Sequence, residues 1–151
     1  MAMTMSGEYE LPVPRETVWE KLNDAETLKA CIPGAEQLDK LSDTELQAVV
    51  TTKIGPVKAK FKGKVTLSDL DPPNGYKISG QGDGGVAGFA TGGATVKLEP
   101  KDGGTLLIYT VEAQIGGKLA QLGQRLVNGA AKKLADDFFQ KFAATVSAAG
   151  A

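Results

Sequence analysis

The sequence predicts an α+β protein with a helix-grip fold: a curved antiparallel sheet of six to seven strands wraps around one long C-terminal helix, with two short helices after the first strand. Three observations support this fold class. Apolar and polar residues alternate with a period of two from about residue 35 to 116, which is typical of half-buried strands. From about residue 117 to 147 the period becomes helical. Short turns join the successive strands, which favours antiparallel pairing.

The chain begins with a strand signal at residues 7–13, where apolar and acidic side chains alternate. Pro14 suits the first turn of a helix, because the N–H that proline lacks is not needed there. We therefore expect a first short helix at 16–22. A second short helix is expected at 25–32, with Asp24 as its N-cap.

The clearest strand is predicted at 57–70, where small and apolar residues alternate with lysines and other polar residues. Successive side chains of a strand point to opposite faces, so one face of this strand should be buried and the other solvated. The lysines on the solvated face are Lys58, Lys60, Lys62 and Lys64. The other strands are predicted at 35–41, 45–50, 76–82, 89–100 and 105–115.

The predicted C-terminal helix carries an apolar stripe on one side and polar residues, Asp136 among them, on the other. Gly123 and Gly129 fall inside this helix, where each glycine costs about 1 kcal/mol relative to alanine. Two such residues suggest close backbone contact, flexibility or open space beside the helix. The apolar stripe consists of Leu119, Leu122, Leu126, Val127, Ala130, Leu134, Phe138 and Phe142.

Composition narrows the classes of function. The formal charge of −1 provides no overall field that would attract nucleic acid. The sequence has no histidine, which removes the usual general base and the commonest metal ligand. Cys31 is the single cysteine, so an internal disulfide and a thiolate metal cage are excluded. We expect no catalytic residue, metal or cofactor, and one domain over residues 1–151 with an ordered core at about 6–147.

Targeting signals are also missing from the sequence. Residues 1–7 lack the basic and apolar regions of a secretory signal, and no stretch approaches the roughly 18 apolar residues that span a bilayer. We therefore expect a cytoplasmic protein whose contact with a membrane, if it has one, is peripheral at the inner face.

Small residues recur on the predicted inner face of the sheet, at Ala48, Gly63 and Gly80 among others. They would either let the helix pack closely on the sheet or leave a cavity for an apolar ligand, and both explanations remain open. Tyr109 would then be a polar contact for the ligand, or else a core tyrosine bonded to the backbone. The candidate cavity residues are Phe61, Phe89, Val96, Tyr109, Val111, Leu119, Leu122, Gly123 and Leu126.

Residues 80–85 match the pattern G-x-G-x-x-G. A dinucleotide site requires a helix N-terminus directly after this pattern, whereas a glycine-rich, strand-like segment follows here. The pattern therefore indicates a glycine-rich hairpin with unusual backbone dihedrals. Alternatively, residues 80–93 form a mobile flap with Phe89 at its tip, closing the cavity.

The four lysines at 58–64 have more than one interpretation. They could be an ordinary solvated face, or a docking surface for anionic headgroups or an acidic protein. Glu8 and Glu10 could instead lie on a neighbouring strand and pair with them.

Four segments carry a resemblance to a known family: IPGAE at 32–36, the lysine-rich strand at 54–67, the glycine-rich region at 80–98 and VEAQIGGKLAQLGQRLVNGAAKKLADDFF at 111–139. Over about residues 6–145 the chain resembles the CoxG family of carbon monoxide dehydrogenase subunits, which belongs to the START-like (SRPBCC) superfamily. The resemblance implies a helix-grip fold with a hydrophobic cavity. It also implies a non-catalytic accessory role beside a molybdenum hydroxylase or carbon monoxide dehydrogenase, in membrane recruitment or in binding a quinone-like lipid that carries electrons.

Two other functions remain open. Some members of the family have a C-terminal tail for membrane contact, whereas this sequence ends at Ala151 shortly after the predicted helix, which favours carrier or docking roles. The first alternative is a docking or maturation factor without a physiological ligand. The second is a small START-like cyclase or hydratase, which would need acids or bases inside the cavity.

Overall fold

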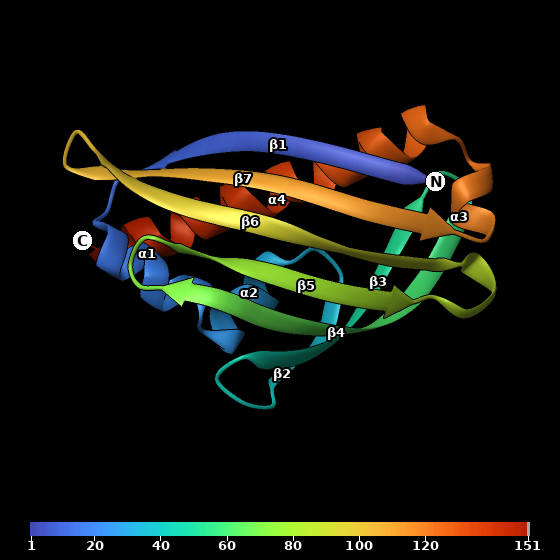
Figure 1. The fold of residues 1–151 in the computed structure, drawn as a ribbon, viewed down its shortest axis with the longest axis horizontal. Coiled ribbons are helices and arrows are strands. Elements are labelled where there is room, and N and C mark those ends of the chain that lie inside the picture. The colour runs from blue at the N-terminus through green and yellow to red at the C-terminus, as the bar shows by residue number, and fades with distance from the viewer. Residues whose placement is uncertain (151) are drawn as a thin grey trace.

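The computed structural model describes the backbone of residues 1–150 and the side chains of residues 1–148. Within this range, seven antiparallel strands form one curved sheet, and the long helix α4 runs along one face of it (Figure 1). The short helices α1 and α2 lie at one end of the sheet, and α3 lies at the other end, beside the N-terminus. The α+β helix-grip prediction is confirmed.

The elements follow the predicted order. The strands are β1 (Ala2–Leu11), β2 (Ala35–Lys40), β3 (Glu45–Ile54), β4 (Val57–Asp71), β5 (Gly75–Asp83), β6 (Phe89–Lys101) and β7 (Gly104–Gly116). The helices are α1 (Arg15–Leu22), α2 (Ala25–Cys31), the 3-10 turn η1 (Gly85–Ala87), α3 (Lys118–Gln121) and α4 (Gln124–Gly150).

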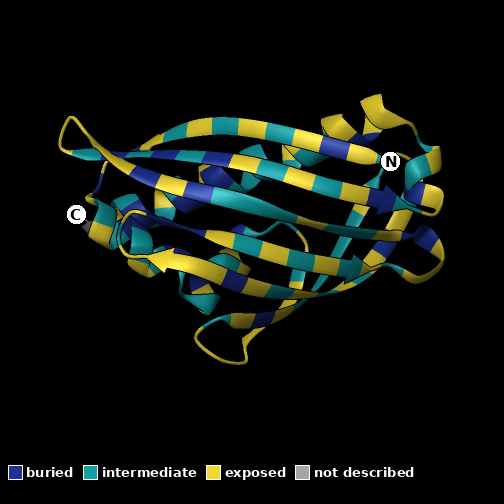
Figure 2. Ribbon diagram, in the orientation of Figure 1, coloured by how far each residue is buried: buried dark blue, intermediate teal, exposed yellow. Residues whose placement is uncertain are grey.

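The strand order is β1-β7-β6-β5-β4-β3-β2, so the first strand closes against the last one. Each other neighbouring pair is consecutive in sequence, because short turns such as Gly55–Pro56 link them. Alternation of apolar and polar residues fixes the register, since a shift by one residue would expose the whole apolar set. Figure 2 shows this alternation as changes of colour along the strands.

β1 begins at Ala2, although the sequence pattern placed the start of the strand at residue 7. The alternation continues toward the N-terminus, with Met3 buried and Met5 half-buried on the inner side. The terminal ammonium of Met1 donates a hydrogen bond to the carbonyl of Ile115 at 2.9 Å. Pairing with β7 therefore continues to the first residue of the chain.

The prediction of one uninterrupted C-terminal helix is wrong. The backbone of Gly123 has φ +92°, which separates α3 from α4. This dihedral is favourable only for glycine, because a Cβ would crowd the following carbonyl. The N–H of Gly123 closes the first turn on Ala120, and its carbonyl accepts the N–H of Val127 at 3.1 Å to start α4.

Two apolar clusters fill the molecule. The larger one joins the sheet to α1, α2 and the C-terminal half of α4, with Val18, Leu107, Phe142 and Val146 completely buried. The smaller one lies at the other end of the sheet, under α3. Its buried residues are Met3, Ile115, Leu119 and Val127.

Candidate ligand-binding site

A cavity of about 410 Å³ lies between the inner face of the sheet, α2 and the aromatic residues of α4. On the helical side, Leu28 of α2 and Phe138 and Phe139 of α4 line it. Most of its wall is apolar. The residues that line it from the sheet include Leu38, Leu46, Ala48, Phe61, Gly63 and Val96.

Small residues on neighbouring strands leave this space open. Ala48 of β3 is paired with Gly63 of β4, and both line the cavity at the centre of the sheet. The pairing continues to Gly82 and Ala90 on β5 and β6, which extends the row of small inner positions across four strands. Since neither methyl nor hydrogen reaches far above a sheet, the aromatic rings of α4 do not meet the sheet at this row. The expected small-residue inner face is therefore present where the cavity lies.

Of the described residues that line the cavity, three have polar side chains: Asn23, Lys40 and Tyr76. The side-chain amide of Asn23 donates to the carbonyl of Trp19 at 2.9 Å, and Lys40 Nζ donates to the carbonyl of Asn23 at 3.3 Å. Lys40 is exposed, so these two residues mark the place where the cavity meets solvent.

Tyr76 is buried, with 6% of its surface exposed, and its ring packs edge-on against Trp19 at 5.2 Å between centroids. Burial raises the pKa of Tyr76 to about 12, so the phenol stays protonated at neutral pH. The sequence patterns above did not single out this residue. Its place two positions before Ile78, on the inner side of β5, could have identified it.

Phe61 and Val96 are the two predicted cavity residues that line this cavity. Tyr109 does not line it: its ring stacks against Phe139 at 5.4 Å in the larger core cluster, which corresponds to the core-tyrosine interpretation. The close approach of the Tyr109 ring to β1 requires a glycine there, since a Cβ on Gly7 would lie 2.8 Å from the phenol oxygen.

Five further predicted cavity residues lie toward the end of the sheet covered by α3. Leu119 is buried in the smaller cluster, and Val111 and Leu122 pack against it. Gly123 forms the break between the helices. Leu126 is 41% exposed and lies beside the turn at Gly55. None of these five lines the cavity described above.

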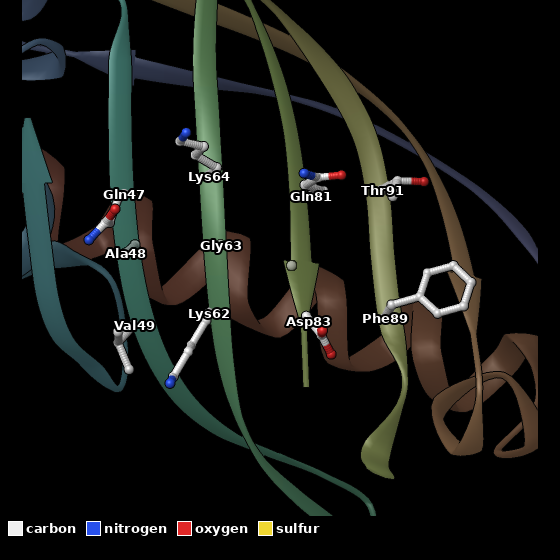
Figure 3. A pocket seen from close by; sticks show the side chains of 11 residues that line it. Gln47, Ala48, Val49, Lys62, Gly63, Lys64, Gln81, Asp83, Phe89 and Thr91 are labelled. Carbon is white, nitrogen blue, oxygen red and sulfur yellow. The ribbon is translucent and has the colours of Figure 1, made fainter. Parts of the chain in front are cut away.

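Phe89 lies on the outer face of the sheet, which we define as the face turned away from α4 (Figure 3). It is 50% exposed and its ring covers Gly116 of β7, so it does not close the cavity as the flap hypothesis expected. The tip of the β5–β6 hairpin is instead Val86 in η1, which is 86% exposed. The N–H of Gly85 donates to Asp83 Oδ1 at 2.8 Å within this hairpin. The glycine-rich hairpin interpretation of residues 80–85 is confirmed.

The four lysines of β4 are all exposed on the outer face, as predicted. Lys60 pairs with Glu36 at 3.3 Å. The suggested pairing with Glu8 and Glu10 is wrong, because three strands separate β1 from β4, and Glu10 pairs with Lys101. Lys62 and Lys64 border a shallow depression of about 660 Å³ across β3 to β6 (Figure 3). Its other side chains include Gln47, Gln81, Asp83 and Thr91.

Membrane-spanning helices and metal clusters do not occur in the described part of the chain. There, no helix combines the length and apolar character needed to cross a bilayer. Within the same residues, cysteine and carboxylate side chains form no group of three that could hold a metal ion.

Comparisons with known proteins agree with this architecture. A conserved protein from Geobacillus kaustophilus, known from its crystal structure, is 35% identical, with a TM-score of 0.91 and coverage of 99% of this chain and 98% of that one. The ZhuI aromatase/cyclase from Streptomyces sp. R1128 has a TM-score of 0.71 at 10% identity, covering 97% and 94%. Ara h 8.0201 has a TM-score of 0.69 at 18% identity, covering 99% and 100%. The last two similarities show the fold alone.

No curated protein matched the chain in the comparison. Among protein families, CoxG, whose description names it as a subunit of carbon monoxide dehydrogenase, matches residues 7–147. This range runs from within β1 to near the end of α4 and includes every residue that lines the cavity. The chain therefore belongs to the CoxG family of carbon monoxide dehydrogenase subunits and has the START-like helix-grip fold.

Proposed function

We propose that the protein is a non-catalytic accessory protein that binds a hydrophobic, quinone-like lipid in the cavity beneath α4. It would serve a molybdenum hydroxylase or carbon monoxide dehydrogenase, assisting its recruitment to the inner face of the cytoplasmic membrane or its electron transfer. The family supports the partner, and the cavity supports the ligand. The observation that carries the proposal is the apolar space between the Ala48–Gly63 pair and the ring of Phe138.

The free energy of an unfilled cavity favours an occupant. At about 24 cal/mol per Å³, the scale set by cavities in mutant cores, a volume of about 410 Å³ corresponds to on the order of 10 kcal/mol. A whole domain is stable by only ~5–15 kcal/mol. An apolar ligand that displaces water from this space would recover part of that free energy, so binding should raise the stability of the fold.

The volume also limits the ligand. Pockets for small molecules range from roughly 300 to 1,000 Å³, and this one is near the lower end. It has room for one ring system with a short chain. A long isoprenoid chain would extend beyond the cavity, where a membrane or a partner protein could cover it.

Native mass spectrometry of the protein purified from its own host tests this proposal. We expect a bound apolar molecule, and an increase in melting temperature when quinones with short side chains are added. The proposal would be contradicted if the protein carried no ligand in repeated preparations and quinones left its melting temperature unchanged.

A second candidate function is docking or maturation of the partner enzyme without a ligand. The observation that favours it is the outer face of β4, where Lys58, Lys62 and Lys64 have no ion-pair partner among the described side chains. Together with the adjoining depression, these lysines are suited to an acidic protein surface. In a pull-down, reversal of Lys58, Lys60, Lys62 and Lys64 to glutamate should release the partner.

Reversal of exposed lysines elsewhere, such as Lys29 and Lys97, is the matched control and should leave the complex intact. Retention of the partner by the fourfold variant would contradict docking through β4. Binding of that surface to anionic vesicles instead would assign the lysines to a membrane.

A small enzyme is the third possibility, and the fold shared with an aromatase/cyclase keeps it open. Lys40 and Tyr76 are the titratable side chains among the described residues that line the cavity. The raised pKa of Tyr76 keeps it a proton donor, so it cannot act as a general base at neutral pH. These groups suit ligand binding better than acid–base catalysis.

A further inference from the structure

Tyr76 differs from the other tyrosines of the protein in its hydrogen bonding. The hydroxyl of Tyr9 donates to Asp136, and Tyr109 lies close to Tyr9 in the same aromatic stack. Among the described residues, by contrast, none accepts a hydrogen bond from Tyr76. Its ring lines the cavity and is more than nine-tenths buried.

An unpaired hydroxyl in such a place is unfavourable. Removing a hydroxyl from water without a new partner costs about 1–3 kcal/mol, and buried tyrosines usually find a partner. Phenylalanine would supply the same ring against Trp19 without that cost. A ligand with an acceptor oxygen would satisfy the phenol, which explains why a tyrosine is compatible with this apolar surface.

The polar residues of the cavity gather at one end. Lys40 on β2 is paired with Leu46 on β3, and Leu46 with Val65 on β4. Tyr76 lies at the start of β5, at this same end of the sheet beside α1. Toward the β3–β4 turn, the cavity is lined by the pairs Ala48–Gly63 and Val50–Phe61, which offer no polar side chain.

We infer that Tyr76 is the hydrogen-bond donor that orients the ligand, by binding a carbonyl or similar acceptor oxygen at the α1–α2 end of the cavity while the hydrocarbon part points toward the β3–β4 turn. The inference rests on the proposed ligand-binding function and adds to it the class and direction of the ligand. The ligand is an oxygen-bearing ring or chain that is apolar at its other end.

A matched pair of probes tests this role: 2-methyl-1,4-naphthoquinone and 2-methylnaphthalene, which share one ring system and differ in the two carbonyl oxygens. Their dissociation constants are measured by displacement of 1-anilinonaphthalene-8-sulfonate from wild type and from Tyr76→Phe. We expect the substitution to weaken quinone binding about tenfold and to change naphthalene binding less than twofold. The infrared carbonyl stretch of the bound quinone should be shifted to lower frequency in wild type and not in Tyr76→Phe.

Tyr109→Phe is the control, because this buried tyrosine does not line the cavity; it should leave both affinities unchanged. If wild type binds neither probe, the proposed carrier function fails. If wild type binds the quinone and Tyr76→Phe binds it equally well, the carrier function stands and the role of Tyr76 is refuted. Equal weakening of both probes also refutes it, since the tyrosine would then act through packing alone.

Discussion

The hydroxyl of Tyr9 on β1 donates a hydrogen bond to the carboxylate of Asp136 on α4, which joins the first strand to the last helix. The ring of Tyr9 also stacks on Phe139, with 4.3 Å between centroids. Because Phe139 lines the cavity, this contact fixes the helix at the height where its rings cover the small residues of the sheet. The helical period placed Asp136 on the solvent side of the helix; the side chain is instead half-buried beside Tyr9.

Tyr9→Phe should destabilise the protein by about 1 kcal/mol, the usual net contribution of one hydrogen bond. The ring, and with it the stacking on Phe139, is retained. Urea unfolding followed by the fluorescence of Trp19 measures the change. Glu8→Gln on the exposed side of the same strand is the control and should have little effect.

The stability of the protein should depend on Asp136 in acid. The hydrogen bond from Tyr9 and then that from Lys132 hold the pKa of Asp136 below its ordinary value. A folded-state pKa that is lower than the unfolded one stabilises the fold above the unfolded pKa, and this contribution disappears as the pH falls through the folded one. The difference in free energy of unfolding between wild type and Asp136→Asn should therefore shrink when the pH is lowered from 7 to 3. An equal difference at both pH values would contradict this assignment.

Ala48→Leu should fill part of the cavity from the sheet side and weaken the binding of apolar probes by more than tenfold. Displacement of 1-anilinonaphthalene-8-sulfonate by 2-methyl-1,4-naphthoquinone measures the effect. Gln47→Leu adds the same side chain to the outer face one position earlier and should leave binding unchanged. If both variants bind like wild type, the ligand lies elsewhere in the molecule.

Gly123 and Gly129 should respond in opposite directions to alanine. Gly123 has φ +92°, so alanine there should destabilise the fold by about 1–2 kcal/mol. Gly129 lies within α4, where an added Cβ would meet no other atom within 4 Å, so alanine should stabilise it by about 1 kcal/mol. Thermal unfolding of the two single variants measures both effects. Stabilisation by both substitutions would mean that α3 and α4 can join into one helix.

Local patterns predict much of this structure correctly. The alternation at 57–70 places the lysines outside and Phe61 inside, because a strand has only two faces and one of them must be buried. The glycine-rich pattern at 80–85 is a hairpin, as the strand-like residues after it indicate. The break at Gly123 is a different case, since a helical period continues across it and only a backbone dihedral marks it.

The cavity residues show where such patterns stop. Parity along a strand assigns Tyr109 and Phe61 to the same inner face, yet one stacks in the core and the other lines the cavity. The difference arises from what faces each residue across the sheet. Tyr109 meets Tyr9 and Phe139, whereas Phe61 lies on a strand whose neighbouring inner positions are glycine and alanine.

Period and turn chemistry along the chain were thus sufficient for the order of the elements, the antiparallel sheet and the side of each strand that is buried, because these follow from interactions between residues close in sequence. The position of the cavity, the donor role proposed for Tyr76 and the contact between Tyr9 and Asp136 depend on how α4 crosses the curved sheet. That crossing brings together side chains more than a hundred residues apart, and their meeting is decided by packing in three dimensions.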